Sequence, residues 1–380
     1  MSKNKTIAIF SGYYLPFLGG IERYTDKLTE ELVKLGYHII LVTSKHDDSL
    51  ADKEEVNGRT IYRLPVINLF KQRYPILNIN NTYRQLMSDL GEQDIDYVIC
   101  NTRFHLTTPT GLRFAKKKGI PSLVIDHGSS HFSVNNAFLD FFGAIYEHLL
   151  TFYVKHLTKH FYAVSKRSAN WLEHFGIQAE GVIYNSVSAN LFEDFSGTKL
   201  LDKMESEIFI TYAGRILKEK GIEVLLEAFE YSNFAKHIKL IIAGDGPLLE
   251  VLKEQYTNQQ IYFLGKRDFK ETMSLMAQTD IFVYPSMYPE GLPTSILEAG
   301  ILESAIIATD RGGTIEVINQ EDLGIIVEEN AKSLSRALKE LVDNSDKRLL
   351  LQKNIHERII NKFTWSQTVK QLEKILSQLK

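Results

Sequence analysis

Apolar residues in the first half of the chain form short runs that alternate with segments of helical periodicity. The run Thr6–Ser11 has the composition of a buried central strand in a parallel sheet. A helix-spaced series follows it and ends at Gly36, a residue that favours helix termination. Further strands are expected at Ile39–Thr43, Ile61–Leu64, Tyr97–Cys100, Ser122–Asp126, Phe161–Val164 and Gly181–Tyr184. Alternation of this kind predicts a doubly wound α/β domain.

The alternation restarts after a polar segment, Ala189–Glu207, which has no clear periodicity and is interpreted as a linker. The chain from Ser333 onward is expected to be largely helical. Strands are predicted at Ile208–Ala213, Lys239–Ala243, Ile261–Leu264, Ile281–Tyr284, Ala305–Ala308 and Gly324–Val327. Helices are predicted at Ile222–Phe229, Leu248–Gln255 and Phe269–Ala277. The pattern therefore predicts two α/β domains, residues 1–190 and 191–363, with a ligand at the carboxyl ends of the second sheet.

Composition narrows the class of protein. The chain has 380 residues, 44% of them apolar and 24% charged, which is typical of a soluble protein with more than one core. Its formal charge of −3 argues against a nucleic-acid partner. The single cysteine, Cys100, excludes an intramolecular disulfide and fits a reducing compartment. Because no apolar stretch approaches the ~20 residues of a membrane span, a cytoplasmic location is expected.

The segment from Tyr288 to Gly300 carries the densest set of chemical features. Glu290 and Glu298 are placed around a turn that is expected to open a helix, with Pro293 at the first helical position. Gly291 lets a ligand approach the backbone because it has no Cβ. The unpaired amides of the first helical turn, from Thr294 onward, would bind an anion such as a diphosphate. The Glu298 carboxylate could accept two hydrogen bonds from a ribose diol.

Polar residues also follow the predicted strands of the second domain. Arg215 and Lys220 come after the strand Ile208–Ala213, where a guanidinium and an ammonium could neutralise a diphosphate. If Arg215 and Lys220 are considered alone, the simpler interpretation is that they are solvated surface cations. Because the turn with Glu290 and Glu298 also predicts a phosphate site, a role in phosphate binding is favoured. Asp245 lies in a Gly-Asp-Gly-Pro turn, which turn chemistry largely explains. Lys266 follows the strand Ile261–Leu264, where the backbone could meet the edge of a base.

Two positions in the first domain are candidates for the same ligand. Gly19 and Gly20 precede a helix N-terminus, which is an anion-binding position, although a flexible loop would have the same sequence. His127 directly follows the strand Ser122–Asp126 beside Gly128 and could approach the ligand. A structural histidine is a competing interpretation, and it is preferred for His131 and His105. Asp126 could orient His127 or cap the turn.

The same residues allow other functions. Two glutamates could form the acid/base pair of a glycosidase, but a phosphate-binding turn beside one of them would then have no use. The aromatic segment Phe138–Phe161 could lie on a membrane surface, and burial in the protein is the favoured alternative. No Cys/His spacing of zinc type and no Walker-type loop is present in the sequence, so no metal and no cofactor are expected.

Several motifs resemble those of retaining GT-B glycosyltransferases of group 1, family 4. They occur in the same order as in that family and extend from the first strand to the last helix. The motifs are Gly19–Tyr24, Tyr184–Val187, Ala213–Gly221, Ala243–Pro247, Glu290–Ala299 and Phe363–Trp365. The spacing of the two glutamates together with the Arg/Lys pair is the most specific feature. Leu292 departs from the family, in which a Phe is frequent at this position.

The resemblance implies two Rossmann-like domains facing a cleft, with the helix 364–380 packed back onto the first. It assigns Arg215 and Lys220 to the diphosphate of a nucleotide-sugar and Glu298 to its ribose. Glu290 and the backbone of Gly291, Leu292, Pro293 and Thr294 would lie along the sugar and the β-phosphate. Gly20 would close over the diphosphate, and His127 would contact the donor sugar or position the acceptor.

The expected reaction is transfer of a hexosyl unit from a UDP- or GDP-sugar to a hydroxyl of a polysaccharide or lipid-linked oligosaccharide precursor. The resemblance implies retention of the anomeric configuration without a metal, because the cations Arg215 and Lys220 take its place. Contact with the inner membrane surface is compatible with such an acceptor. The alternatives are a sugar-nucleotide epimerase of the same fold and a non-catalytic partner of a true transferase; a phosphorylase is disfavoured because no lysine site for pyridoxal phosphate is evident.

Overall fold

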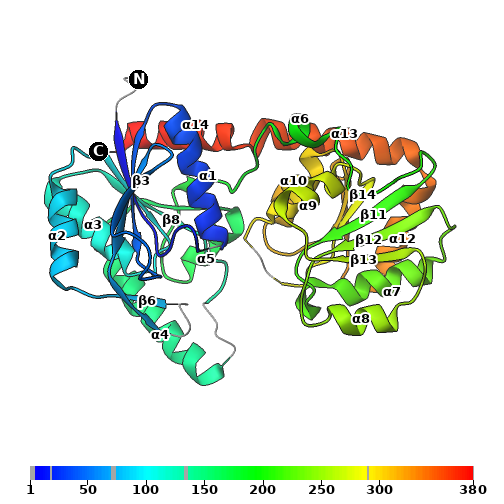
Figure 1. The fold of residues 1–380 in the computed structure, drawn as a ribbon, viewed down its shortest axis with the longest axis horizontal. Helices are drawn as coiled ribbons and strands as arrows, with labels where there is room; N and C mark the ends of the chain where they lie inside the picture. The colour runs from blue at the N-terminus through cyan, green and yellow to red at the C-terminus, as the bar shows by residue number, and fades with distance from the viewer. Residues whose placement is uncertain (1–4, 18, 70–73, 132–135, 289–290, 380) are drawn as a thin grey trace. The chain divides into compact units, whose positions relative to one another are not determined.

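The computed structural model describes residues 5–17, 19–69, 74–131, 136–288 and 291–379. They form two compact units, one of Met1–Asn185 with Thr368–Lys380 and one of Ser186–Gln367 (Figure 1). The polar segment 189–207, expected above to be a linker, therefore belongs to the second unit, where it contains the short helix α6 (Leu191–Phe195). Among the described residues, no helix combines the length and the apolar character that crossing a bilayer requires.

The first unit is built on a sheet in the order β10-β9-β8-β7-β1-β2-β4-β3, parallel except for the β3–β4 pair. Its strands are β1 (Thr6–Phe10), β2 (His38–Ser44), β3 (Lys53–Val56), β4 (Arg59–Leu64), β7 (Tyr97–Asn101), β8 (Ser122–Asp126), β9 (Phe161–Ala163) and β10 (Gly181–Val182). A separate hairpin joins β5 (Val66–Leu69) and β6 (Tyr74–Leu77). The helices are α1 (Gly20–Lys34), α2 (Asn81–Gly91), α3 (Thr107–Lys118), α4 (Ala137–Lys155) and α5 (Lys166–Glu173).

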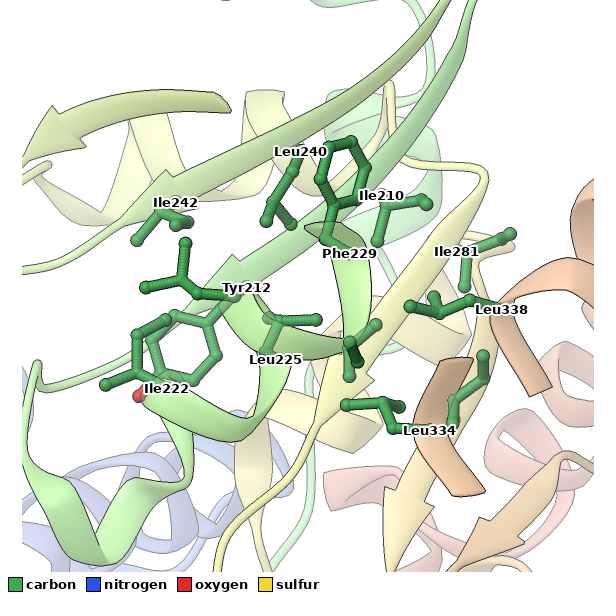
Figure 2. Close-up of a cluster of buried hydrophobic side chains, with 14 of the residues drawn as sticks. Ile210, Tyr212, Ile222, Leu225, Phe229, Leu240, Ile242, Ile281, Leu334 and Leu338 are labelled. Atoms are coloured by element: carbon green, nitrogen blue, oxygen red, sulfur yellow. The ribbon is translucent and has the colours of Figure 1, made fainter. Parts of the chain in front are cut away.

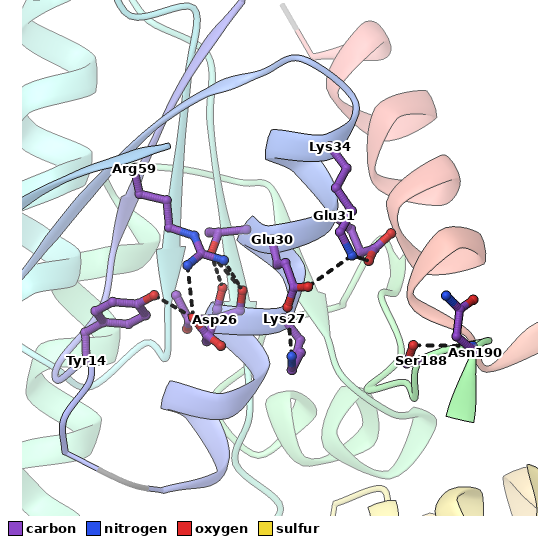
Figure 3. Close-up of polar contacts among 11 residues, drawn as sticks. Tyr14, Asp26, Lys27, Glu30, Glu31, Lys34, Arg59, Ser188 and Asn190 are labelled. Carbon is purple, nitrogen blue, oxygen red and sulfur yellow. Dashed lines mark hydrogen bonds and ion pairs between the residues drawn. The ribbon is translucent and has the colours of Figure 1, made fainter. Parts of the chain in front are cut away.

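Strand β1 lies between β2 and β7, so the strand order reverses at β1, as expected of a doubly wound sheet. Helix α1 follows β1, and its Asp26 side chain bonds the helix to neighbouring parts of the unit. Asp26 accepts hydrogen bonds from the Tyr14 hydroxyl at 2.8 Å and from Arg59 Nη1 of β4 at 3.1 Å (Figure 3). Because Arg59 is almost fully buried, this ion pair fixes the position of α1 on the sheet.

The second unit has a wholly parallel sheet in the order β13-β12-β11-β14-β15-β16. Its strands are β11 (Ile208–Ala213), β12 (Ile238–Ala243), β13 (Ile261–Gly265), β14 (Ile281–Tyr284), β15 (Ala305–Thr309) and β16 (Ile325–Val327). Besides α6, its helices are α7 (Ile222–Ser232), α8 (Leu249–Gln255), α9 (Phe269–Met276), α10 (Thr294–Ile301), α11 (Thr314–Val317), α12 (Ala331–Asp343) and α13 (Ser345–Lys362). Helices cover both faces of the sheet (Figure 1).

The core of the second unit forms where α7 and α12 pack on the sheet. Ile222, Leu225 and Phe229 of α7 are spaced three or four residues apart, so they share one face of the helix. Figure 2 shows them among the side chains of β11 and β12 and beside Leu334 and Leu338 of α12. Close packing of this kind holds the strand ends, and the loops that follow them, in fixed positions.

The last helix, α14 (Trp365–Gln378), begins in the second unit and belongs to the first unit from Thr368 onward. Its polar side chains bond to the first unit's backbone. The Thr368 hydroxyl donates to Tyr184 O at 3.2 Å, and Gln371 Nε2 donates to Val182 O at 2.6 Å. At its far end, Glu373 accepts a hydrogen bond from the Tyr37 hydroxyl at 3.0 Å.

Candidate active site

The carboxyl ends of the second sheet meet through backbone contacts that only glycine permits. The Gly244 amide donates to Gly265 O at 2.9 Å, which joins the ends of β12 and β13. A Cβ on Gly244 would lie 1.8 Å from Gly214 O, the residue after β11. A Cβ on Gly246 would lie 2.3 Å from Ile216 O. The Gly-Asp-Gly-Pro turn is therefore required for close strand-end packing as well as for the turn itself.

Arg215 and Lys220 lie in the loop between β11 and α7, at the point where the strand order of the second sheet reverses. Lys220 ends a short 3₁₀ turn (Lys218–Lys220), and the left-handed Gly221 (φ 71°) leads into α7. Burial lowers the pKa of Lys220, and the positive charge of Arg215 lowers it further against the opposing effect of Glu219. The structure thus places the two predicted cations close enough for the charge of Arg215 to affect Lys220.

The loop that carries the cations contacts the loop after β14. The Met287 amide donates to Glu219 O at 2.9 Å, and the Lys220 ammonium lies 5.4 Å from the centroid of the Tyr288 ring. The second distance is within cation–π range. The cations therefore lie against the segment that leads into α10.

Helix α10 begins at Thr294, and Pro293 is its N-cap, so the prediction that Pro293 takes the first helical position is wrong by one residue. Within the described part of the chain, no side chain caps this helix end. The first-turn amides of Thr294, Ser295 and Ile296 have no intrahelical acceptor in an α-helix. These amides are therefore available to an anion, and their binding of a diphosphate stays a prediction.

The other predicted residues of this segment differ in their burial and in their contacts. Leu292 is buried, and Glu298 lies half-buried on α10, one turn after Thr294. Gly291 O accepts a hydrogen bond from the Gly313 amide, which ties this loop to the one after β15. Glu290, predicted to contact the sugar, lies outside the described residues.

Asp245 and Lys266 are both exposed at strand ends. The Asp245 carboxylate accepts a hydrogen bond from the Gly246 amide at 2.7 Å, so it stabilises its own turn. Its carbonyl accepts one from the Ile216 amide at 2.9 Å, next to Arg215. Lys266 follows the edge strand β13, which β12 separates from β11, so the sheet places it farther from the cations.

In the first unit, Gly19 is the N-cap of α1 and Gly20 its first residue. The Glu22 carboxylate folds back onto this helix end, because a Cβ on Gly19 would lie 2.3 Å from Glu22 Oε2. Glu22 is 5% exposed, and burial raises its pKa. The chain's own carboxylate thus lies where an anion was predicted, and a phosphate bound to Gly19 and Gly20 would have to displace it.

His127 lies at the carboxyl end of β8 among side chains that the sequence pattern did not single out. Its Nε2 is 3.4 Å from Asn101 Oδ1, and Asn101 Nδ2 donates to the Thr25 hydroxyl at 2.8 Å. The Tyr24 ring meets the imidazole edge-on at 4.7 Å. Burial lowers the pKa of His127 to about 4, so the imidazole is neutral at pH 7. Asn101 directly follows the predicted strand Tyr97–Cys100, just as His127 follows the predicted strand Ser122–Asp126. A polar residue at a predicted strand end is therefore the sequence signal that points to both.

Asp126 does not orient His127. It is fully buried and accepts hydrogen bonds from the Arg103 amide at 3.1 Å and from Arg103 Nη1 at 2.7 Å. Arg103 is also fully buried, and its Nη2 donates to Glu147 Oε2 at 3.2 Å. Asp126 therefore pairs with a buried cation, which fixes the end of the strand that carries His127.

Helix α4 contradicts the expectation that the segment Phe138–Phe161 is buried. A row of its large apolar side chains is exposed to solvent, although Val154 near its end is buried. The exposed residues are Phe138, Leu139, Phe141, Phe142, Ile145, Leu149 and Phe152. We call this set the α4 apolar face. Its residues are spaced along one side of the helix, so they form a continuous surface.

Comparisons with known proteins identify the class to which this fold and site belong. The family "Glycosyltransferase Family 4" matches residues 18–191, and "Glycosyl transferases group 1" matches residues 199–358. An uncharacterized glycosyltransferase of Methanocaldococcus jannaschii is 30% identical over the full length of both chains. The chain therefore belongs to the group 1, family 4 glycosyltransferases and is a transferase enzyme.

More distant relatives and solved structures agree with this assignment. The GPI3 subunit of the Saccharomyces cerevisiae phosphatidylinositol N-acetylglucosaminyltransferase is 21% identical over 98% of this chain and 83% of its own length. The Anabaena protein HepE, solved in complex with UDP, superimposes with a TM-score of 0.73 at 16% identity, over 99% of this chain and all of that one. The predicted GT-B fold is confirmed.

Proposed function

We propose that this enzyme transfers a hexosyl unit from a UDP-sugar, or alternatively a GDP-sugar, to a hydroxyl of a membrane-borne acceptor, with retention of anomeric configuration. The observation that carries the proposal is the position of the two cations Arg215 and Lys220 in one short loop after β11, with the Lys220 ammonium against the Tyr288 ring in the segment that leads into α10. Two adjacent cations repel one another, and a diphosphate bound between them would relieve that repulsion. The first-turn amides of α10 would add neutral donors to the same anion.

These groups would promote the departure of the nucleoside diphosphate. As the bond between the anomeric carbon and the phosphate oxygen breaks, its electron pair moves onto the diphosphate and negative charge builds there. Donors already in position stabilise this charge without reorganisation, which is commonly the largest catalytic contribution. One such cation is worth about 2–4 kcal/mol of transition-state stabilisation. In this scheme Arg215 and Lys220 make a metal ion unnecessary.

Retention would follow from attack on the face that the diphosphate leaves. The acceptor oxygen forms the new bond to the anomeric carbon and passes its proton to a phosphate oxygen, which balances the reaction. His127, neutral at pH 7, would exchange hydrogen bonds with a sugar hydroxyl rather than act as a cation. Glu298 would bind the ribose diol, and Glu290 the transferred sugar.

Binding of UDP to the HepE protein, which has the same fold, favours a uridine donor. The acceptor is suggested by the relatives that are phosphatidylinositol N-acetylglucosaminyltransferase subunits, whose name points to a lipid acceptor. We propose a lipid-linked acceptor, such as a lipid-linked oligosaccharide, ahead of a free polysaccharide precursor.

The α4 apolar face supports this choice, because seven large apolar side chains exposed on one helix are unusual for a surface in water. Exposed Lys116, Lys117 and Lys118 end α3, the helix that contacts α4, and would attract acidic headgroups. The enzyme would then work peripherally at the cytoplasmic face of a membrane, with the α4 apolar face inserted among the lipids.

The test is thermal-shift screening against UDP-, GDP- and ADP-sugars. A donor at about one hundred times its Kd should stabilise the protein by about 2.7 kcal/mol. Incubation of the donor hit with lipid extracts, followed by NMR of the product, should show transfer with the donor's anomeric configuration. An epimerase of the same fold would instead consume the donor without any lipid, and an inverted product would contradict retention. Failure of every nucleotide to bind would overturn the proposal.

A further inference from the structure

Three histidines that are far apart in the sequence converge in the first unit. His131 lies in the loop after β8, His148 on α4 and His174 at the C-cap of α5. Their ring centroids are 5.0 to 5.6 Å apart, and one nitrogen of each ring can be chosen so that all three lie within 4.8 Å of one another. Their spacing matches no metal-binding motif, which is why the sequence did not reveal them.

We propose that His131, His148 and His174 bind one divalent transition-metal ion, with Zn²⁺ as the expected ion. Imidazole nitrogens suit Zn²⁺, Cu²⁺ and Ni²⁺, and three of them with one water complete a tetrahedral site. At a Zn–N distance of about 2.0–2.1 Å, tetrahedral geometry places the nitrogens about 3.4 Å apart. His148 and His174 are exposed, so small adjustments of their side chains would bring the nitrogens to this spacing.

A buried carboxylate supports this assignment. Glu147, which is 1% exposed, places its Oε2 3.0 Å from His131 Nδ1. In metal sites the ring nitrogen that does not bind the metal commonly donates to a carboxylate, which fixes the tautomer and the ring orientation. Here an N–H on Nδ1 would leave the Nε2 lone pair of His131 for the ion.

Packing holds the ligand-bearing segments in place. The Lys155 ammonium at the end of α4 donates to Phe175 O at 2.8 Å, which ties α4 to the residue after His174. The Trp171 ring stacks on His174 with 4.8 Å between centroids and an interplanar angle of 9°. Phe175 meets all three imidazoles at 4.8 to 5.8 Å. This aromatic backing limits the orientations of the rings before any ion arrives.

An ion at this site would connect the loop after β8 with α4 and α5. It would also act on the strand end that carries His127, because Glu147 bonds to Arg103 and Arg103 bonds to Asp126. The role that we infer is therefore structural: the ion holds the loop beside His127 and takes no part in sugar transfer.

The experiment uses untagged full-length protein, stripped with EDTA and dialysed, then titrated with CoCl₂ while visible absorption is recorded. ZnCl₂ is added afterwards to displace Co²⁺. We expect one ion per chain, a spectrum of tetrahedral Co²⁺ that Zn²⁺ abolishes, and a rise in Tm with ZnCl₂. The variants are His148→Ala, His174→Ala and Glu147→Gln. The control is His156→Ala, an exposed histidine that ends the same helix α4.

Loss of His148 or His174 should weaken Co²⁺ binding at least tenfold, whereas His156→Ala should bind as the wild type does. Glu147→Gln should keep the tetrahedral spectrum with affinity reduced about tenfold or more. The two substituted histidines, His148 and His174, are exposed, so their replacement should not disturb folding. Circular dichroism of the metal-free variants tests whether the variants fold. Absence of stoichiometric binding by the wild type, or equal binding by His148→Ala and His174→Ala, would overturn the proposal. In either case the histidines would be an aromatic packing cluster only.

Discussion

Gly221 packs directly against the carbonyl of Pro285. A Cβ at Gly221 would lie 1.9 Å from that oxygen, and the residue has a left-handed backbone (φ 71°). This contact joins the loop that carries Lys220 to the loop after β14, and so sets the distance between the cations and α10. Neither the bend nor the contact tolerates a side chain.

Gly221→Ala should therefore destabilise the second unit by more than the left-handed conformation alone requires. The conformation costs about 1–2 kcal/mol, and overlap with the Pro285 backbone adds about 1–3 kcal/mol. The matched control is Gly265→Ala, which has the same φ of 71° and open space around its Cβ position. Urea unfolding of both variants should show a clearly larger loss for Gly221→Ala; equal losses would mean that the contact with Pro285 is unimportant.

Arg215→Ala and Lys220→Ala should each reduce kcat by some hundreds-fold, because each removes about 2–4 kcal/mol of stabilisation from the departing diphosphate. Arg215 is exposed, so its removal should leave the unfolding free energy nearly unchanged. Lys218→Ala removes an exposed cation from the same 3₁₀ turn and serves as the control. Steady-state kinetics with the donor found by screening provides the measurement. If Lys218→Ala reduced kcat as much as the other two substitutions, the effect would come from the positive charge of the whole loop and not from specific contacts of Arg215 and Lys220.

Glu298→Ala should weaken UDP binding by about tenfold to a hundredfold, through loss of charge-assisted hydrogen bonds to the ribose. The decisive measurement is the Kd, by calorimetry, of both the wild type and the Glu298→Ala variant for UDP and for 2′,3′-dideoxy-UDP. The wild type should bind the dideoxy compound more weakly, and Glu298→Ala should bind both equally. If the variant still discriminated between them, Glu298 would not be the ribose ligand.

Stability should fall as the pH is lowered from about 6.5 to about 4, in part through His105. Burial lowers the pKa of this histidine to about 4, whereas in the unfolded chain it is near 6.5. Between these values the unfolded state binds the extra proton, so unfolding is favoured by up to about 1.4 kcal/mol per pH unit. Below pH 4 both states are protonated and this loss ends.

His105→Asn should make this dependence shallower. The measurement is urea unfolding at pH 7 and pH 5 in a Trp365→Phe background, so that Trp171 fluorescence reports the first unit. His38→Asn, at an exposed histidine that begins β2, is the control. Identical slopes for His105→Asn and the wild type would show that His105 titrates normally.

Replacing Phe141, Leu149 and Phe152 by Ser should reduce co-sedimentation with vesicles that contain acidic phospholipid by at least tenfold. These residues belong to the α4 apolar face, and their burial in lipid is the expected source of affinity. Activity on a water-soluble acceptor should be unchanged. Leu349→Ser with Leu350→Ser, at two exposed leucines of α13, is the control. Unchanged sedimentation of the triple variant would exclude the α4 apolar face as a membrane anchor.

Local sequence determined the central strands and the order of the motifs. Ser122–Asp126, Ile208–Ala213 and Ile281–Tyr284 occur as predicted, because a continuous apolar run bounded by polar residues is buried on both faces only in a central parallel strand. The position of Arg215 and Lys220 just after the strand Ile208–Ala213 also follows from the sequence, and their role in diphosphate binding stays a prediction. The edge strand β3, with its Lys-Glu-Glu-Val sequence, has no such run, and the short strands of the hairpin β5–β6 contain Asn68 and Pro75; the sequence pattern predicts neither element.

Tertiary structure decided what depends on residues distant in the sequence. The prediction that α4 is buried is wrong because its composition is largely apolar, and composition does not reveal whether another element covers a helix. The sequence allows two roles for Asp126, whereas the fold places Arg103 against it in an ion pair. The three histidines lie on segments that only the packing of α4 and α5 brings together. The sequence records which groups are present, whereas their distances follow from the packing of elements that the chain joins over many residues.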